Sequence, residues 1–130
     1  MTTIFTKIIN GELPAYKVAE DAKYLAFLDV NPNAKGHTLC IPKHAVNKIF
    51  DMDEQDYLGL MSFSRKVAKA LEKTVPCKRV GVAVVGLEVP HAHVHLIPIN
   101  SANDLNFTQA KLKLSPEQLK KVQEKIISNL

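Results

Sequence analysis

The chain has 130 residues, of which 46% are hydrophobic and 23% charged, and its formal net charge is +4. This size and balance are typical of one globular domain, and they exclude a disordered chain, a collagen-like repeat and a disulfide-stapled scaffold. No apolar run reaches the ~18–20 residues of a membrane span. Lys7 interrupts the apolar stretch of Met1–Asn10, which lacks a small-residue cleavage site, so we expect no signal peptide. We predict one domain over residues 1–130 and no membrane partner.

The positive charge is concentrated at the C-terminal end, where residues 111–130 hold five lysines against two glutamates. Such a run is typical of a solvated helix face rather than of a surface that attracts polyanions, so we predict no nucleic-acid partner. The two cysteines, Cys40 and Cys77, match no zinc or redox spacing. Without a cysteine framework or an export signal, the expected location is cytoplasmic.

Residue patterns predict two helices and three strands in the first part of the chain. A short helix is expected over Thr3–Ile9, where apolar residues pair at i,i+4 before Gly11. Strands separated by turn residues are expected over Tyr16–Glu20, Tyr24–Val30 and His37–Ile41. A long amphipathic helix is then expected over Asp53–Thr74, with Leu58 and Phe63 on its exposed side.

Two further strands, Val80–Val85 and His91–Ile99, are rich in β-branched residues, and a last helix is expected over about residues 115–130. The first turn of that helix has an N-terminal capping signature formed by Ser115, Pro116 and Gln118. Strands come in runs rather than alternating with helices, which is typical of an α+β fold. We predict an antiparallel sheet of about five strands with two main helices.

Three of the five histidines form a row of alternate residues, His91, His93 and His95. Alternate residues of a strand share a face, so the three imidazoles are expected on one side, with Ala92 and Val94 toward the core. Three imidazoles and a water would suit a catalytic zinc ion. Alternatively, one imidazole can attack as a nucleophile while its neighbours donate protons or bind negative charge. The spacing alone leaves both uses open.

The sequence around this row resembles the signature of the histidine triad (HIT) superfamily, His-φ-His-φ-His-φ-φ with φ apolar, which His91–Ile97 match. Two earlier blocks are similar to the Hint branch of that superfamily: Ile4–Ala15, and Leu25–Pro32 followed by Gly36–His44. The likeness covers most of residues 3–99 in the family's order. The chain is therefore identified as a member of this superfamily, with a single HIT domain over residues 1–130.

The resemblance implies a hydrolase or transferase that acts on the α-phosphate of nucleoside monophosphate derivatives, such as phosphoramidates. The reaction would pass through a nucleotidyl-histidine intermediate, which divides one difficult displacement into two. The resemblance also implies a purine nucleotide of the AMP or GMP type as ligand and a homodimer. It implies neither a cofactor nor a catalytic metal ion.

The resemblance also assigns roles to individual histidines. His93, the middle member of the row, is the expected nucleophile. The main-chain carbonyl of His91 would orient the other ring nitrogen of His93 and fix its tautomer. His95 and the upstream His37 would hold phosphate oxygens.

By the same resemblance, Asp29 stands at the acidic position that binds the ribose hydroxyls, and Phe27 and Val30 stand near the base. A carboxylate can accept from both hydroxyls of a sugar diol. Asp29 also has a simpler interpretation, as a residue that initiates the turn before Asn31 and Pro32.

The chain departs from the family pattern just before the histidine row, where Gly86–Pro90 replaces the usual Gly-Gln-Ser/Thr-Val stretch. Glu88 and Val89 therefore occupy positions that contact the phosphate and the leaving group in the family. Leu87 and Glu88 motivate an alternative function, a nucleotide-binding module with little turnover.

Thr3 and Thr6 mark a second departure, because some bacterial members have a Cys-x-x-Cys pair there that helps to bind structural zinc. We therefore expect no such zinc site. A zinc enzyme that uses the histidine row as ligands remains a further alternative.

Overall fold

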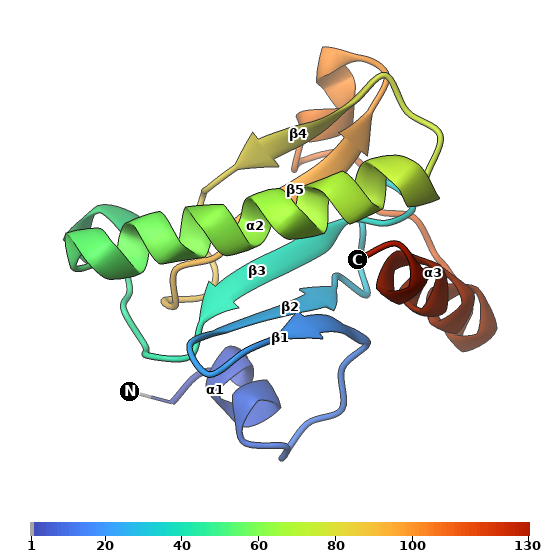
Figure 1. Cartoon of the computed structure of the whole chain (residues 1–130). Helices are drawn as coiled ribbons and strands as arrows, with labels where there is room; N and C mark the ends of the chain where they lie inside the picture. The colour runs from blue at the N-terminus through green and yellow to red at the C-terminus, as the bar shows by residue number, and fades with distance from the viewer. Residues whose placement is uncertain (1) are drawn as a thin grey trace.

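The computed structural model describes residues 2–130 and contains a five-stranded sheet with three α-helices (Figure 1). The strands are β1 (Lys17–Glu20), β2 (Tyr24–Leu28), β3 (Thr38–Pro42), β4 (Arg79–Ala83) and β5 (Val94–Ile99). They lie in the order β1-β2-β3-β5-β4, and every neighbouring pair is antiparallel. The predicted α+β fold with a five-stranded antiparallel sheet is confirmed.

Two of the helices begin at a residue whose side chain caps the N-terminus. The helices are α1 (Ile4–Ile9), α2 (Glu54–Thr74) and α3 (Pro116–Ser128), with 3-10 turns at Ile49–Asp51 and Ala102–Leu105. Thr3 caps α1, and its hydroxyl accepts from the backbone N–H groups of the first turn. Ser115 and Gln118 form the predicted capping box of α3, which satisfies two backbone donors that the helix itself leaves free.

Alternation along the strands divides the core into two clusters, one on each face of the sheet. Ala26 of β2 and Cys40 of β3 lie in the cluster that packs against α2 and α3. Leu25, Phe27, Leu39 and Ile41 belong to the cluster on the other face, with Phe5 of α1. One face is therefore covered by the two long helices, and α1 covers part of the opposite face.

Strand β5 begins at Val94, so the prediction of a strand from His91 is wrong for its first three residues. The backbone of these residues makes other hydrogen bonds. His91 N donates to Val89 O at 2.8 Å, and Ala92 N donates to Val46 O at 2.7 Å. Because both N–H groups bond to loop residues, the segment cannot continue the sheet ladder.

Strand β2 ends at Leu28 rather than at Val30. Asp29 Oδ1 accepts a hydrogen bond from Asn31 N at 2.8 Å, which turns the chain directly after the strand. The other strand ends lie within two residues of the predicted ranges. Pro42 lies inside β3 as its last residue.

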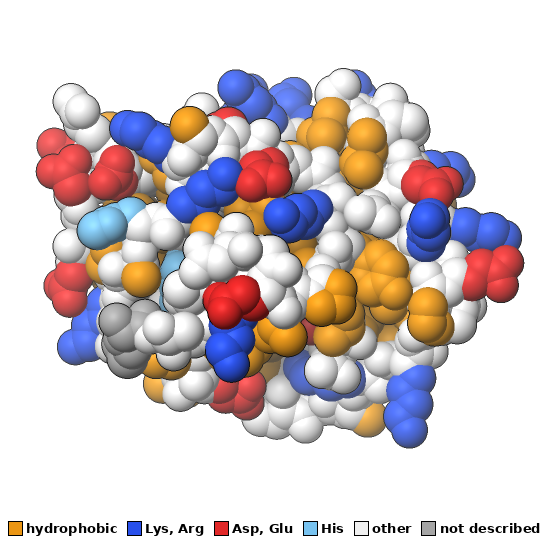
Figure 2. Space-filling model, turned by 90° about the horizontal axis from the view of Figure 1, so that it is seen from below, with side chains coloured by type: hydrophobic (Ala, Val, Ile, Leu, Met, Phe, Trp, Pro, Cys, Tyr) orange, Lys and Arg blue, Asp and Glu red, His pale blue; other side chains and the backbone are white. Residues whose placement is uncertain are grey.

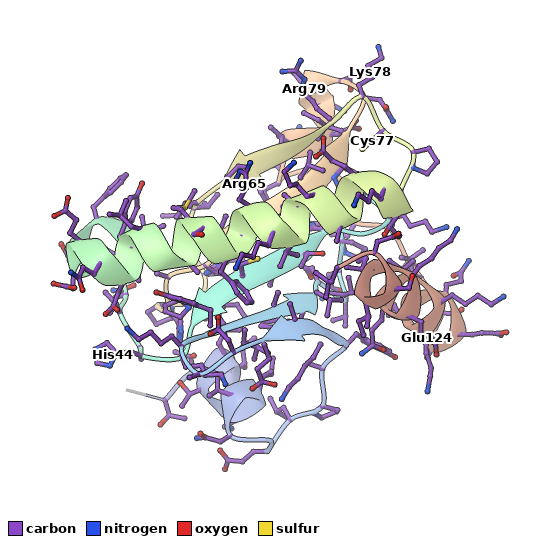
Figure 3. All side chains as sticks on the ribbon, in the orientation of Figure 1. His44, Arg65, Cys77, Lys78, Arg79 and Glu124 are labelled. Atoms are coloured by element: carbon purple, nitrogen blue, oxygen red, sulfur yellow. The ribbon has the colours of Figure 1, made fainter. Side chains whose placement is uncertain are left out.

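The exposed side of α2 carries Leu58 as predicted, but Phe63 is buried. The Phe63 ring lies against Tyr24 of β2, with 5.6 Å between ring centroids. Both cysteines are free: Cys40 is buried in β3, and Cys77 lies in the connection from α2 to β4 (Figure 3).

The surface has no strong concentration of one charge on the side seen from below, where basic and acidic side chains are interspersed (Figure 2). Among residues 2–130, none of the helices combines the length and apolar character needed to cross a bilayer.

Candidate active site

Four histidines gather on the sheet face that α2 does not cover. His95 lies in β5 opposite Leu39 of β3, and His37 directly precedes β3. The ring centroids of His93 and His95 lie 4.8 Å apart, and those of His37 and His95 lie 5.2 Å apart. The fold thus brings His37 next to the histidine row across 58 residues of sequence.

The His93 ring is held by its own backbone. His93 Nδ1 lies 2.7 Å from the carbonyl oxygen of His91, and because a carbonyl only accepts, Nδ1 must carry the proton. In the neutral ring, Nε2 then has a free lone pair. The ring of Phe5 in α1 lies edge-on to His93 with 5.0 Å between centroids, which further restricts its orientation.

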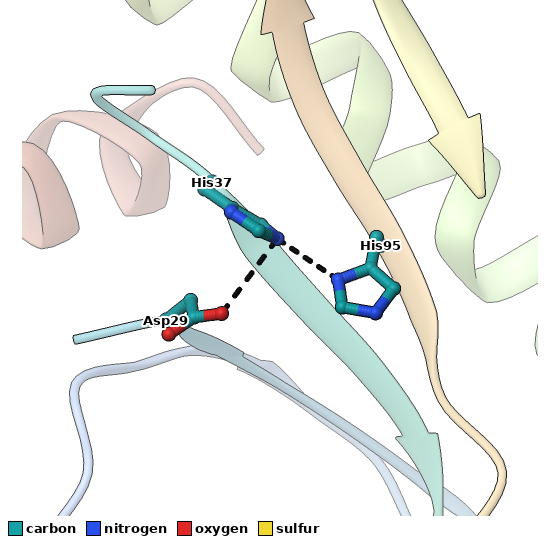
Figure 4. Close-up of side chains that lie close together, drawn as sticks. All are labelled: Asp29, His37 and His95. Carbon is teal, nitrogen blue, oxygen red and sulfur yellow. Dashed lines mark hydrogen bonds and ion pairs between the residues drawn. The ribbon is translucent and has the colours of Figure 1, made fainter. Parts of the chain in front are cut away.

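His37 and His95 are linked in a second chain of hydrogen bonds (Figure 4). The backbone N–H of Asn33 donates to His37 Nδ1 at 3.0 Å, so the proton of a neutral His37 lies on Nε2. His37 Nε2 in turn donates to His95 Nδ1 at 2.9 Å. The proton of a neutral His95 is therefore on its remaining nitrogen, Nε2.

Both rings are kept neutral by their surroundings. Burial, together with the nearby His95, Lys111 and His93, lowers the pKa of His37 to about 3. Burial, His93 and Lys111 lower the pKa of His95 to about 4. Near neutral pH the hydrogen-bond chain therefore fixes one tautomer for each ring.

The His91 side chain has a different environment from the other two members of the row. It is fully buried, and Nε2 donates to the carbonyl oxygen of Pro42 at 2.7 Å. Its Nδ1 is buried and has no hydrogen-bond partner among residues 2–130, and burial lowers the pKa of this ring. His91 is hydrogen-bonded to the neighbouring His93 ring through its backbone carbonyl and not through its side chain.

Asp29 lies at the edge of the histidine cluster. Its Oδ2 is 3.7 Å from His37 Nε2, while Oδ1 accepts from Asn31 N in the turn described above (Figure 4). Burial raises the pKa of Asp29, partly offset by the hydrogen bond from Asn31 N. The turn-initiating role is therefore real, and the carboxylate still has lone pairs free for a ligand.

The remaining expected site residues differ widely in exposure. Phe27 is buried and packs against Phe5, with 5.5 Å between ring centroids. Val30 is 54% exposed. Glu88 is exposed and Val89 half-buried on the loop before the histidine row, and Val89 packs against the α1-side cluster.

One expectation does not fit these contacts, namely that His37 holds a phosphate oxygen. His37 is 1% exposed, and both ring nitrogens are already bonded within the protein. His37 can act on a ligand through His95, but it has no free ring nitrogen.

Residues to which the family resemblance assigned no role also shape the site. Phe5 contacts His93, and Phe107 lies against His95 with 4.7 Å between centroids. Lys111 Nζ hydrogen-bonds to Asn33 Oδ1. Phe107 and Lys111 lie in a segment without helical or strand periodicity, so no local pattern indicated them.

Metal binding by the cluster requires a rearrangement. Asp29, His37 and His95 place ligand atoms within 4.8 Å of one another. However, His37 Nε2 and His95 Nδ1 share a proton at 2.9 Å. Two nitrogens on a tetrahedral zinc would lie about 3.3 Å apart with no proton between them. Within the row, His91 Nε2 and His93 Nδ1 donate to backbone carbonyls, so these two nitrogens are not free to bind zinc.

The structural zinc site of some relatives does not fit this chain. The hydroxyls of Thr3 and Thr6 form the capping box of α1, and a neutral hydroxyl is a poor substitute for a thiolate. His44, the histidine outside the cluster, is exposed on the loop after β3 and projects away from the sheet (Figure 3).

Known proteins resemble this chain in sequence and in fold. The adenosine 5'-monophosphoramidase of Schizosaccharomyces pombe is 33% identical over 132 residues, covering 100% of this chain and 99% of that protein. A Hit-like protein from Bartonella henselae superposes with a TM-score of 0.84 at 29% identity, covering 98% of this chain and 95% of the other.

A zinc-bound histidine triad family protein from Mycobacterium smegmatis has a TM-score of 0.81, with 99% of this chain and 93% of that chain covered. At 23% identity this similarity shows the fold alone. The family model of the HIT domain matches residues 10–102. This chain therefore belongs to the HIT domain family.

Proposed function

We propose that this protein hydrolyses nucleoside 5'-phosphoramidates, with a purine nucleotide as the preferred ligand and His93 as the nucleophile. Hydrolysis of nucleotides is supported at the family level by the domain match and by the phosphoramidase relative. The observation that carries the assignment of the nucleophile is the 2.7 Å contact between His93 Nδ1 and His91 O, which leaves Nε2 unprotonated.

In the first step, His93 Nε2 attacks the α-phosphorus and the phosphorus–nitrogen bond of the substrate breaks. The electron pair of that bond goes to the leaving nitrogen, which takes up a proton from solvent and departs as an amine. The nucleotidyl-imidazole is cationic, because Nδ1 keeps its proton, and the carbonyl of His91 stabilises this charge. His95 Nε2–H donates to a phosphate oxygen as negative charge increases there.

In the second step, water attacks the same phosphorus and the bond to Nε2 breaks. The electron pair of the phosphorus–Nε2 bond returns to the imidazole ring, and the attacking water gives its proton back to solvent. Nucleoside monophosphate is then released. In this proposal, Asp29 accepts hydrogen bonds from the ribose hydroxyls. Phe27 and Val30 flank the region expected for the base.

The experiment is to incubate the full chain with adenosine and guanosine 5'-phosphoramidates and to measure release of AMP or GMP. A covalent adduct should be trapped by rapid quenching at alkaline pH, because phosphoramidates of histidine are labile in acid. Peptide mass spectrometry should place one nucleotidyl group on His93. Release without any adduct, or an adduct on another residue, would contradict the mechanism.

A nucleotide-binding module with little turnover is the second candidate, favoured by the exposed Leu87 and Glu88 where the family has Gln and Ser or Thr. Leu87 is 89% exposed and offers no polar group to a leaving group. AMP binding measured by calorimetry, together with turnover no faster than the His93→Asn variant, would support this alternative.

A zinc-dependent function is the third candidate, favoured by the proximity of Asp29, His37 and His95. We expect activity to persist after dialysis against a chelator, because the mechanism uses histidine nitrogens alone. Activity that is lost with the chelator and restored by zinc would support the metal alternative.

A homodimer is part of the proposal. β4 is an edge strand of the sheet, and Val82 in it is 52% exposed. Leu58 on α2 is 56% exposed. An unpaired strand edge with apolar side chains is suited to pairing with a second copy across a two-fold axis.

A further inference from the structure

The segment that links β5 to α3 passes beside the histidine cluster. It includes the 3-10 turn Ala102–Leu105 and then continues without regular structure. In Figure 1 it leaves the upper end of β5 and descends to α3. Leu112 N donates to Pro32 O at 2.9 Å, which ties the segment to the turn before β3. We call residues 102–114 the strap.

Asn33 connects the strap to His37. Its side chain is buried, and Nδ2 donates to the carbonyl oxygens of Asp104 and Asn106 at 3.1 and 3.3 Å. Oδ1 accepts from Lys111 Nζ. The backbone N–H of Asn33 donates to His37 Nδ1 at 3.0 Å. The strap thus holds the side chain of the residue whose backbone sets the proton position on His37.

Phe107 brings the strap into direct contact with two histidine rings. Its centroid lies 4.7 Å from that of His95 and 6.3 Å from that of His37. Lys111 Nζ lies 5.1 Å from the Phe107 centroid, a typical cation–π distance. Lys111 is therefore fixed by two partners, Asn33 and Phe107. Its charge adds to burial in disfavouring a second proton on His37 or His95.

We propose that Asn33 and Lys111 are positioning residues that hold His37, and through it His95, in the tautomers required to stabilise the negative charge that develops on the phosphate in the transition state. This inference rests on the proposed function. If the Asn33 N–H were displaced, a neutral His37 could place its proton on Nδ1. His37 Nε2 would then offer a lone pair, and His95 would have to protonate Nδ1. His95 Nε2 would then present a lone pair in place of an N–H donor, and the negative charge that develops on the phosphate oxygen in the transition state would lose its stabilising hydrogen bond.

The test compares Lys111→Met, Lys111→Arg and Lys113→Met in the full chain labelled with ¹⁵N at histidine. Met keeps the length and apolar contacts of the lysine stem but cannot bond to Asn33. Lys113 is an exposed lysine of the same strap and provides a matched control. Ring-nitrogen spectra report the tautomer of each histidine without substrate, and AMP release from adenosine 5'-phosphoramidate gives kcat and KM.

In Lys111→Met we expect His37 and His95 to change from single tautomers to mixtures, and kcat to fall on the order of tenfold with KM nearly unchanged. Lys111→Arg and Lys113→Met should both keep the single tautomers and the kcat of the wild type. Unchanged ring spectra in Lys111→Met would overturn the inference. An increase in KM alone would overturn it as well, because Lys111 would then be a substrate contact. Tautomer mixing in a chain that hydrolyses none of the substrates would refute the proposed function and retain the positioning role.

Discussion

His93 and His95 lie two residues apart with ring centroids separated by 4.8 Å, yet their hydrogen bonds fix them in opposite tautomers. The carbonyl of His91 keeps the proton of His93 on Nδ1, while His37 keeps the proton of His95 on Nε2. Two identical side chains therefore present different groups within the same site, a lone pair for attack and an N–H donor for negative charge. The difference comes from their partners alone.

Replacement of His93 by Asn should abolish turnover and preserve the fold. The Asn side-chain amide can donate toward His91 O as the imidazole does, but it has no nucleophilic nitrogen. We expect kcat to fall by about a thousandfold or more, as for other lost nucleophiles. Steady-state kinetics and thermal unfolding would measure both effects, with His44→Asn on an exposed loop as the control. A variant that retains most of the wild-type rate would show that His93 is not the nucleophile.

The buried neutral histidines should make the protein sensitive to mild acid. Their pKa values fall from 6.5 to about 3 in His37 and about 4 in His95 on folding, so below pH 6.5 the unfolded chain binds protons that the folded chain does not. The free energy of unfolding should therefore fall as the pH is lowered, by up to about 1.4 kcal/mol per pH unit for each histidine. The loss should be complete once the pH is below the folded pKa.

Urea unfolding between pH 7.5 and 4.5 would measure this dependence. The His95→Asn variant retains an acceptor for His37 Nε2. Its free energy of unfolding should change less steeply with pH than that of the wild type, because one of the two buried histidines no longer contributes. The His44→Asn control should keep the steep slope if buried histidines cause it. Equal slopes in wild type and His95→Asn would indicate that His95 is protonated in the folded state.

Much of the fold could be predicted because its signals are local. Short apolar segments between turn residues located β2 and β3, and Ser115 with Gln118 located the start of α3. The start of β5 could not be predicted this way. The backbone N–H groups of His91 and Ala92 donate hydrogen bonds to loop residues, and residue types alone do not indicate which acceptor a backbone N–H group will find.

Site residues that belong to a recognised motif could be predicted from the sequence. Site residues that the fold brings together from distant segments could not. The histidine row and His37 belong to recognisable blocks, whereas Asn33 meets Lys111 across 78 residues. The strap has no period, so nothing in its own sequence indicated that Phe107 packs on His95. The motif also assigned His37 to the phosphate, because sequence cannot show that both of its nitrogens are already bonded.

The proposed homodimer can be tested at the exposed apolar side chain of the β4 edge, Val82. Val82→Lys in β4 should place charges opposite each other if two copies pair through this edge, and it should convert a dimer to a monomer. Sedimentation equilibrium at micromolar concentration would give the mass. Ile127→Lys on α3, where Ile127 is 47% exposed, is the matched control. A wild-type mass of one chain would contradict the homodimer.

The charge of Glu88 should influence which leaving group is released fastest. Glu88 is exposed on the loop before the histidine row, and its carboxylate is close enough to Asp29 to contribute to the raised pKa of that group. An ionised carboxylate only accepts hydrogen bonds, so it cannot donate a proton to a leaving group as a hydroxyl does. It can instead attract a leaving group that carries a second, positively charged amine.

We therefore expect the wild type to prefer a phosphoramidate of a diamine over that of a neutral amine by about fivefold, a size typical of a solvent-screened charge pair. The Leu87→Gln, Glu88→Ser double variant should lose this preference and become faster on the neutral substrate. Glu124→Ser on α3 removes the same charge far from the site and should change neither rate (Figure 3). Raising the salt concentration should weaken the wild-type preference and leave the double variant unaffected. If the ratio of the two rates in the double variant is within twofold of the wild type, Glu88 has no part in substrate choice and only faces solvent.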